Sequence, residues 1–277
     1  GQGQRYLARH FRPSHKGWAL LLLIVIVAAG LRFWQLGEVP PGFYRDEAAN
    51  GLDALDVLSG DRQGQSPFYF AGNNGREPAY IYLTAISVAL LGNTTIAVRL
   101  AAAVVGTLTT WFIYKLAKIW FGKRVGLLSA VIWAITVWPV HLSRIGLRPI
   151  LLPLMLTLVF WLGTLAYRRS RDGRNGTWLW LLSGLVYGLS FYTYLAIRFS
   201  PVILVLLAIY LVLTGRKKAI WPGGAVFVAG AAVTLLPLMI LAVEQPDLLL
   251  GRLGQVSILN PAINNGDLPG ALWRQIW

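Results

Sequence analysis

Residues 79–124, AYIYLTAISVALLGNTTIAVRLAAAVVGTLTTWFIYKLAKIWFGKR, decide the fold of this chain because a short apolar run stands directly before a long one. The long run, Thr95–Leu116, has the length of a membrane-spanning helix. The short run, Ala79–Leu91, would make a helix of about 20 Å, which cannot cross the ~30 Å hydrocarbon core. We therefore expect Ala79–Leu91 to lie along the outer membrane surface or to dip into it.

The composition supports a membrane protein. The chain of 277 residues is 56% hydrophobic and only 13% charged, with a mean hydropathy of +0.58. Segments that cross lipid must be helices, because lipid cannot satisfy backbone polar groups. The basic residues form short clusters between apolar runs, which is typical of cytosolic loops and argues against nucleic-acid binding. The absence of cysteine excludes disulfides and thiol chemistry.

The basic clusters also predict the topology. Arg5, Arg9, Arg12 and Lys16 precede the first apolar run, so the N-terminus is expected in the cytosol. If residues 79–91 do not cross the membrane, every later basic cluster falls on the cytosolic side. Seven spans follow, at Trp18–Trp34, Thr95–Leu116, Val125–Leu142, Ile150–Tyr167, Trp178–Leu195, Phe199–Thr214 and Ala219–Val243.

This topology separates the charges of the chain. Fifteen of the 25 basic residues are cytosolic with Asp172 as their only acid, so the cytosolic side carries the whole net charge of +14. Ten basic and ten acidic residues remain on the outer side. We predict an all-α polytopic membrane protein with seven transmembrane helices and two juxtamembrane helices in the first outer loop. Its parts are a basic tail (1–17), a membrane module (18–243, with the outer loop at 35–94) and an outer segment (244–277), which we expect to continue in a longer chain.

The first outer loop contains a predicted amphipathic helix, Asp46–Leu58. Asp46, Asn50 and Asp53 share one of its faces, opposite a row of apolar residues. One interpretation is structural, with Asp46 as the N-cap and Glu47 as a first-turn acid favoured by the helix dipole. The other is chemical: a carboxylate held just above the membrane would serve as a general base.

A second cluster, Arg76-Glu77-Pro78, starts the short apolar helix. Proline suits a first helical turn. The structural interpretation is that Arg76 extends toward the surface with Glu77 as its partner. A contact with substrate is the alternative.

These features together resemble the GT-C superfamily of integral-membrane glycosyltransferases. The ordered set is the Asp46-Glu47 pair, the helix after Glu77-Pro78, a span that starts Ala97-Val98-Arg99-Leu100 and ends near Phe121-Gly122, and Leu142-Ser143-Arg144. The most similar branch includes protein O-mannosyltransferases and lipid A aminoarabinose transferases, and the resemblance covers about residues 35–200. It implies seven spans with two juxtamembrane helices in the first loop.

The resemblance also implies a reaction. Asp46 would be the catalytic base of an inverting transfer from a polyprenyl-phosphate sugar to an acceptor that the sequence does not name. Glu47 would support Asp46 or hold the acceptor. The active face would be extracytoplasmic, in a bacterial inner or cell membrane.

Four arginines are candidates for the donor phosphate, because guanidinium forks suit phosphate oxygens. They are Arg99, which the resemblance places at the outer start of the second span, together with Arg144, Arg148 and Arg198. Extension of each side chain to the membrane surface is the alternative. Arg76 and Glu77 are further substrate-binding candidates. Tyr192 and Tyr194 would shape the pocket or sit in the interfacial aromatic belt.

Two departures from the family pattern concern binding. Relatives often carry His-Pro-Pro or Lys-Pro-Pro where this chain has Glu77-Pro78-Ala79, so Arg76 would have to supply a cation there. Many relatives also place an acid after the Ser-Arg pair, where this chain has Arg148-Pro149. No metal site and no cofactor is therefore expected, although a divalent metal is not excluded, and His141 stands alone as an outer histidine.

Two other functions fit part of the sequence. The chain could be a non-catalytic membrane subunit that docks to a larger complex, with Asp46 facing a partner. A polyprenyl-lipid carrier would need a polar path, yet no acid occurs between residues 79 and 171. We expect membrane lipids and a polyprenyl-phosphate sugar as partners, and no nucleic acid.

Overall fold

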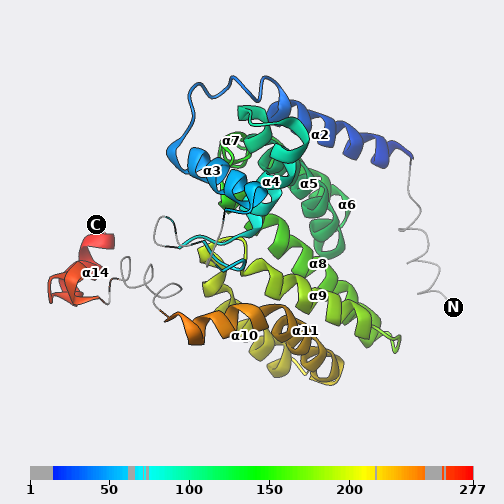
Figure 1. The fold of residues 1–277 in the computed structure, drawn as a ribbon. Coiled ribbons are helices and arrows are strands. Elements are labelled where there is room, and N and C mark those ends of the chain that lie inside the picture. The colour runs from blue at the N-terminus through cyan, green and yellow to red at the C-terminus, as the bar shows by residue number, and fades with distance from the viewer. Residues whose placement is uncertain are drawn as a thin grey trace.

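The protein is described by a computed structural model that covers residues 15–61, 66–70, 72, 75–215, 217–246, 258 and 260–276 (Figure 1). Within these ranges the chain is helical, and the only bridge between extended segments pairs Phe70 with Arg76. The predicted all-α class is confirmed. The elements are α2 (His15–Phe33), α3 (Arg45–Ser59), α4 (Ala79–Leu91), α5 (Thr95–Phe121), α6 (Lys123–Ile135), α7 (Val137–Arg144), η2 (Arg148–Ile150), α8 (Leu151–Arg171), α9 (Thr177–Ser190), η3 (Leu195–Phe199), α10 (Ser200–Leu213), α11 (Lys217–Glu244), α13 (Pro261–Asn264) and α14 (Leu268–Ile276).

Among the residues that the structure describes, four helical segments are long and apolar enough to cross a membrane: Thr95–Phe121, Arg148–Arg171, Leu195–Leu213 and Gly223–Glu244. A fifth span results if the bent pair α6 and α7 is taken as one. The apolar helices α2, α4 and α9 are shorter. The chain is thus an integral membrane protein, while the count of seven spans stays a prediction. Most of the predicted basic tail (1–14) and the outer stretch 247–257 lie outside the described residues.

The first outer loop folds into the two helices that the sequence indicates. The short apolar run is α4, with the predicted bounds, and the amphipathic helix is α3, one residue longer at each end. Figure 1 shows α3 and α4 side by side, and they contact each other. The N-cap of α3 is Tyr44, so the interpretation of Asp46 as the N-cap was wrong. Asp46 is instead the second helical residue.

The predicted single helix Val125–Leu142 is broken. Helix α6 ends at Ile135, Thr136 adopts an extended conformation, and α7 continues at an angle of 53°. Pro139 explains the break, because proline has no N–H to donate to the carbonyl of Ile135 and its ring crowds that carbonyl. The segment that follows is also partly helical, since α7 runs on to Arg144 and η2 begins at Arg148.

Small residues allow the helices to approach closely. Gly184 and Gly188 of α9 lie against the backbone of α11, where an added Cβ would clash with Phe227 at the first position and with Ala231 at the second. This small-xxx-small spacing is common where membrane helices pack. On the other side of the bundle, Leu21, Ile24 and Ala28 of α2 pack against α5 and α6. The side chains of α10 are mostly exposed, as expected of a helix that faces lipid.

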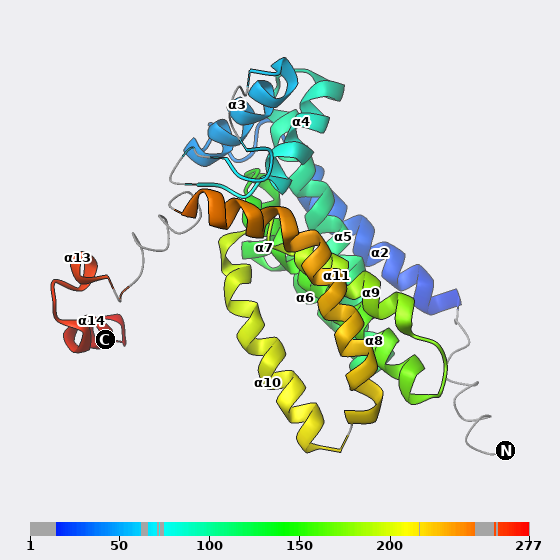
Figure 2. The same cartoon turned by 60° about the horizontal axis from the view of Figure 1, so that its bottom comes forward.

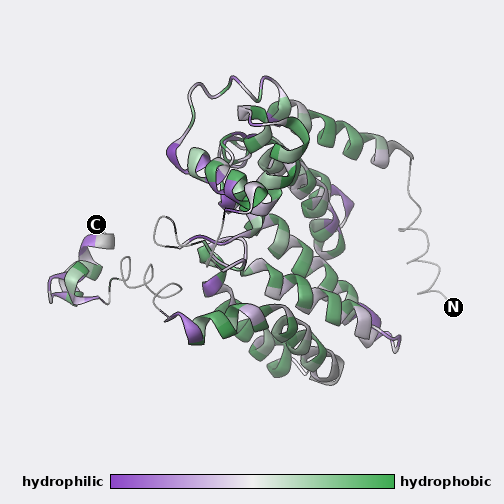
Figure 3. Ribbon diagram, viewed as in Figure 1, coloured by the Kyte–Doolittle hydropathy of each residue, from purple (hydrophilic) through white to green (hydrophobic). Residues whose placement is uncertain are grey.

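The bundle has two distinct ends. Figure 2 shows α3 and α4 at one end, whereas the α8–α9 and α10–α11 turns lie at the other. We call these the α3–α4 end and the opposite end. Hydropathy follows the same division: hydrophobic residues cover the bundle helices, and hydrophilic residues gather on α3 and at the α8–α9 turn (Figure 3). The arrangement agrees with the predicted separation of charges, although which end is cytosolic stays a prediction.

Candidate active site

Helix α3 presents two adjacent carboxylates with different surroundings. Glu47 is 0% exposed, and its Oε2 accepts a hydrogen bond of 3.0 Å from the backbone N–H of Tyr44. That bond satisfies one of the N–H groups left without an intrahelical partner at a helix start. Asp46 is half-exposed, and it makes no hydrogen bond or ion pair with any residue that the structure describes. The two neighbouring acids therefore differ: contacts hold the Glu47 side chain in place, whereas the Asp46 side chain has no such contact with a described residue.

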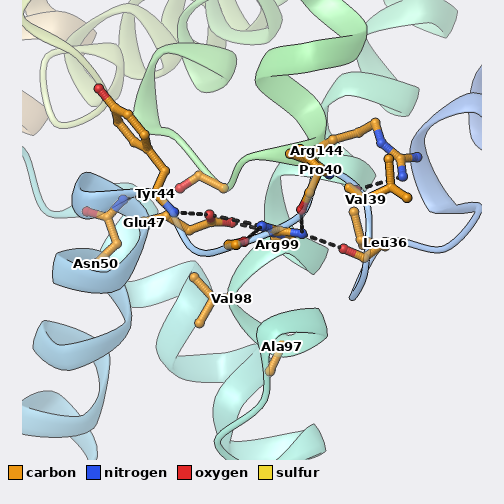
Figure 4. Close-up of polar contacts among 12 residues, drawn as sticks. Leu36, Val39, Pro40, Tyr44, Glu47, Asn50, Ala97, Val98, Arg99 and Arg144 are labelled. Carbon is orange, nitrogen blue, oxygen red and sulfur yellow. Dashed lines mark hydrogen bonds and ion pairs between the residues drawn. The ribbon is translucent and has the colours of Figure 1, made fainter.

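The partner that fixes Glu47 is Arg99, on the second turn of α5. Arg99 Nε lies 2.5 Å from Glu47 Oε1, and Nη2 lies 3.2 Å from Oε2. The two side chains are 1% and 0% exposed. A buried ion pair is stable only when further hydrogen bonds satisfy its remaining groups. Figure 4 shows Arg99 between Glu47 on one side and Leu36 and Pro40 on the other.

The remaining N–H groups of Arg99 bind the loop between α2 and α3, residues 34–44. Nη1 donates to the carbonyls of Leu36 (3.0 Å) and Pro40 (3.1 Å), and Nη2 donates to that of Gly42 (2.8 Å). With the two bonds to Glu47, all five guanidinium N–H groups are engaged. Arg99 thus ties together α5, α3 and the loop that leads into α3.

Arg144, at the end of α7, holds the same loop from the other side (Figure 4). Its Nη1 donates to Leu31 O at 2.8 Å, and its Nη2 donates to Trp34 O at 2.7 Å and to Val39 O at 2.8 Å. Gln35 O is a longer contact at 3.5 Å. The acceptors are backbone carbonyls only, so Arg144 fixes the path of the main chain before Asp46.

Two further ion pairs lie at the start of α4. Arg76 pairs with Asp53 of α3, and Arg148 Nη1 lies 2.9 Å from Glu77 Oε2. All but Asp53 are buried. Sequence reasoning paired Arg76 with its neighbour Glu77, and the structure corrects this: each residue of the Arg76-Glu77 pair binds a partner from a distant segment. Arg76 Nη1 is buried and has no hydrogen-bond partner in the described part of the chain.

The turn between α7 and η2 brings Arg148 close to α3. Asn50 Nδ2 donates to Gly146 O at 3.2 Å, and a Cβ at Gly146 would lie 3.3 Å from Glu47 Oε1. Gly146 has a φ of 56°, a conformation that glycine adopts without strain. Asn50 lies one turn after Asp46 and its Oδ1, like Arg76 Nη1, is buried without a hydrogen-bond partner among described residues. Asp46, Asn50 and the Arg148 turn thus converge at the α3–α4 end.

Tyr80 borders these groups, and Tyr192 contacts the start of α4. Tyr80 of α4 donates to Val98 O at 2.9 Å, and burial, followed by the Glu47 carboxylate, raises its pKa, so the phenol stays protonated. Tyr192 donates to Thr234 O at 2.8 Å, while its own carbonyl accepts from Ala79 N. Tyr194 precedes η3 and is half-buried.

The other predicted site residues are less closely connected. Arg198 lies on η3 and is half-buried. His141 is exposed on α7 beside Trp138. Within the described ranges, no three His, Asp or Glu side chains gather as a metal ion would require, and the metal requirement stays a prediction. Sequence reasoning missed Arg32, which is fully buried in α2. An arginine inside an apolar run was the available signal.

Comparison with known proteins now assigns the family. A family model described as dolichyl-phosphate-mannose-protein mannosyltransferase matches residues 75–242. The chain belongs to this family, which lies in the GT-C superfamily of membrane glycosyltransferases. No curated protein sequence matches the chain.

Solved structures of other GT-C proteins share the fold. The oligosaccharyltransferase AglB from Archaeoglobus fulgidus, in complex with an inhibitory peptide and a dolichol-phosphate, has a TM-score of 0.65 and 19% identity, over 80% of this chain and 29% of AglB. The apo oligosaccharyltransferase of the same organism gives 0.65 and 19%, over 81% and 30%. ArnT from Cupriavidus metallidurans, bound to undecaprenyl phosphate, gives 0.57 and 19%, over 85% and 43%. This chain therefore spans less than half the length of each of these proteins.

Proposed function

We propose that the chain is the membrane module of an inverting glycosyltransferase that takes its sugar from a polyprenyl-phosphate donor. The observation that carries the proposal is the contrast between Asp46 and Glu47. Glu47 is buried and held by Arg99, whereas Asp46 is half-exposed and has no partner among the described residues. A general base must reach a substrate proton, which supports Asp46 over the buried Glu47 in this role.

The reaction follows from that role. The carboxylate of Asp46 removes a proton from an acceptor hydroxyl or amine as the acceptor attacks the anomeric carbon of the sugar. The new glycosidic bond forms on the face opposite the leaving group, and the bond between the anomeric carbon and the phosphate oxygen breaks. The electron pair leaves with the lipid phosphate, and the proton stays on Asp46.

The developing phosphate charge needs a cation, and the arginines are not equivalent in this respect. All N–H groups of Arg99 are engaged, and Arg144 holds four main-chain carbonyls. Arg76 Nη1 has no hydrogen-bond partner among the described residues. We therefore assign the phosphate to Arg76, together with Arg148, whose partner Glu77 is next to Arg76, and Arg198 stays a further candidate. An unpartnered buried donor such as Arg76 Nη1 costs about 1–3 kcal/mol, and a bound anion would offset this cost.

The proposed roles of the other candidates follow their contacts. Glu77 orients Arg148, and Glu47 orients the start of α3. Tyr192 and Tyr194 would shape the pocket wall near α4. The site would face the extracytoplasmic side, because the last turn of α8, which contains Arg168, Arg169 and Arg171 of a predicted cytosolic cluster, lies toward the opposite end of the bundle (Figure 2). The acceptor, and any complex with other subunits, belong to the longer proteins that this chain matches only in part.

The experiment is sugar transfer by the purified protein in lipid vesicles that contain a polyprenyl-phosphate sugar labelled in the sugar. We use dolichyl and undecaprenyl donors in parallel. Asp46→Asn should lower transfer, including transfer to water, by at least about 100-fold. The matched control is Asp56→Asn, because Asp56 is an exposed acid on the same helix.

Binding of the sugar-free lipid phosphate separates the two roles. Asp46→Asn should bind undecaprenyl phosphate as well as the parent does, while Arg148→Gln should bind it more weakly. Full transfer activity in Asp46→Asn would sink the assignment of the base. A parent protein that binds no lipid phosphate and transfers no sugar would instead favour a non-catalytic subunit.

A further inference from the structure

Arg32 is a buried cation inside the helix bundle with an unusual set of partners. It lies near the end of α2 and is 0% exposed. Its guanidinium donates to Ser143 Oγ (3.2 Å), Ala28 O (3.0 Å), Ala134 O (3.1 Å) and Trp133 O (3.2 Å). It forms no ion pair with a described residue. A buried arginine in a membrane helix is costly, so these neutral partners need an explanation.

Two of the partners are carbonyls at the end of α6. In an unbroken helix, Trp133 O and Ala134 O would accept from the N–H groups of Val137 and Trp138. The break at Thr136 removes those donors. Arg32 replaces them, and its positive charge also suits the negative end of the α6 dipole. The α2 arginine is thus a C-terminal cap for α6 at the bend.

Arg144 does the same for α2. Helix α2 ends at Phe33, and Arg144 of α7 donates to Leu31 O and Trp34 O there. Each of the two segments therefore gives an arginine to the end of a helix in the other. Ser143, next to Arg144, joins the two caps because its Oγ accepts from Arg32 and donates to Pro139 O.

Helix α5 packs closely against Arg32 and Ser143 at Gly106. A Cβ on Gly106 would clash with Ser143 Oγ and lie 2.9 Å from Arg32 Nε. The carbonyl of Gly106 also accepts a hydrogen bond of 3.1 Å from Trp133 Nε1. Glycine is the residue that lets α7 and the Arg32 guanidinium approach α5 so closely.

We propose that Arg32 and Arg144 are reciprocal helix caps that fix the bend between α6 and α7 and thereby position the loop that leads into α3, the helix that contains Asp46. Arg32 sets the direction of α7, and α7 delivers Arg144 to the carbonyls at 31–39. Both are positioning residues, because neither is required to touch the substrate. The catalytic part of this inference rests on the proposed function, but the structural part does not.

The chain contains no cysteine, so spin labels can be placed without removing native residues. One label goes on Leu128 in α6 and the other on Asp56 in α3, and both positions are exposed. The distance between the labels is measured by pulsed electron resonance in vesicles. The parent should give a narrow distribution, and Arg32→Gln and Arg144→Gln should each broaden it.

The double variant and matched controls make the test specific. If the caps act as one unit, Arg32→Gln/Arg144→Gln should broaden the distribution no more than the single changes do. Arg171→Gln removes an exposed arginine at the opposite end and should leave it unchanged. Gly106→Ala crowds Ser143 and Arg32 but keeps both arginine charges, and it should also broaden the distance distribution. Unchanged narrow distributions in both arginine variants would overturn the proposal.

Kinetics distinguish positioning from general loss of structure. Misplacement of a catalytic group by about 1 Å can cost about 100-fold in rate. Arg144→Gln should therefore lower kcat by 10- to 100-fold per folded molecule, with KM for the lipid donor within about 3-fold of the parent. Equal kcat with raised KM would assign Arg144 to the phosphate instead and overturn the proposal. If the parent transfers no sugar, the proposed function fails, and the label distances still decide on the caps.

Discussion

The α3–α4 end and the opposite end of the bundle each contain an ion pair between an arginine and a carboxylate, but the two pairs differ in burial. At the α3–α4 end, the Arg99 and Glu47 side chains are 1% and 0% exposed. At the opposite end, Arg171 lies 3.3 Å from Asp172, but the two side chains are 62% and 54% exposed. Water screens an exposed ion pair, so its loss changes the free energy of unfolding little. A buried charge that loses its partner has no water to replace that partner, so breaking a buried pair is strongly destabilising.

The difference teaches what arginine does in this protein. Exposed arginines at the opposite end need no defined partner, and their charge is enough to orient a chain in a membrane. Buried arginines need partners for their N–H groups, and main-chain carbonyls supply most of the partners of Arg32 and Arg99. A guanidinium with five donors therefore acts as a tie between segments that have no regular hydrogen bonding of their own.

The largest loss of stability is expected when the ion pair between Arg99 and Glu47 is broken. Arg99→Gln leaves the Glu47 carboxylate buried without its cation, which should lower the free energy of unfolding by about 3–5 kcal/mol. Denaturant unfolding in detergent micelles measures this. The double variant Arg99→Gln/Glu47→Gln should be less destabilised than the sum of the single changes. Additive losses would show that the two groups do not act as a pair.

A smaller effect is expected at the glycine under the Arg32 cap. Gly106→Ala forces a methyl group against Ser143 and should cost about 1–3 kcal/mol in the same unfolding measurement. The control is Gly30→Ala, because a Cβ at Gly30 meets nothing within 4 Å. That change should be neutral or should stabilise α2 by up to about 1 kcal/mol. Equal changes in the free energy of unfolding at the two glycines would argue against close packing at Gly106.

The free carboxylate should matter little for stability. Asp46→Asn removes no hydrogen bond or ion pair to a described residue and should change the free energy of unfolding by less than about 0.5 kcal/mol. Glu47→Gln, one position along the same helix, should lower it by several times as much because Arg99 loses its partner. A large loss from Asp46→Asn would mean that Asp46 has a structural role and would weaken its assignment as a base.

The smallest effect is expected at the exposed pair. Arg171→Gln should change the free energy of unfolding by less than about 0.5 kcal/mol, because exposed pairs contribute little. Raising the salt concentration to 1 M should not separate the variant from the parent, since the Debye length is then only about 3 Å. A loss comparable to that of Arg99→Gln would remove the distinction between the two ends.

Much of the fold could be predicted from local sequence. The limits of Ala79–Leu91 were correct because Pro78 and Gly92 mark the ends of a helix wherever it packs. The break in α6–α7 was missed, although Pro139 was a local signal, because the apolar run continues through it. A run that is apolar on every side gives no periodicity to show a bend.

The candidate site was predicted less completely. The Asp46-Glu47 pair was singled out, but its division into a free and a fixed carboxylate was not foreseen. Arg76 and Glu77 were paired with each other, whereas their partners are Asp53 and Arg148. Adjacent residues on a turn do not necessarily face each other, and the sequence contains no record of which distant segments meet.

The sequence by itself determined that this protein is helical and membrane-embedded, and where the short helix α4 begins and ends. These properties depend on hydrophobicity and helix-terminal residues, which act within a few residues. Only the tertiary structure decided which acid is free and which arginines bind carbonyls. Arg99 and Glu47 are 52 positions apart, and Arg32 and Ser143 are 111 apart. Such pairs exist only because packing brings buried charges together, where each must find a partner.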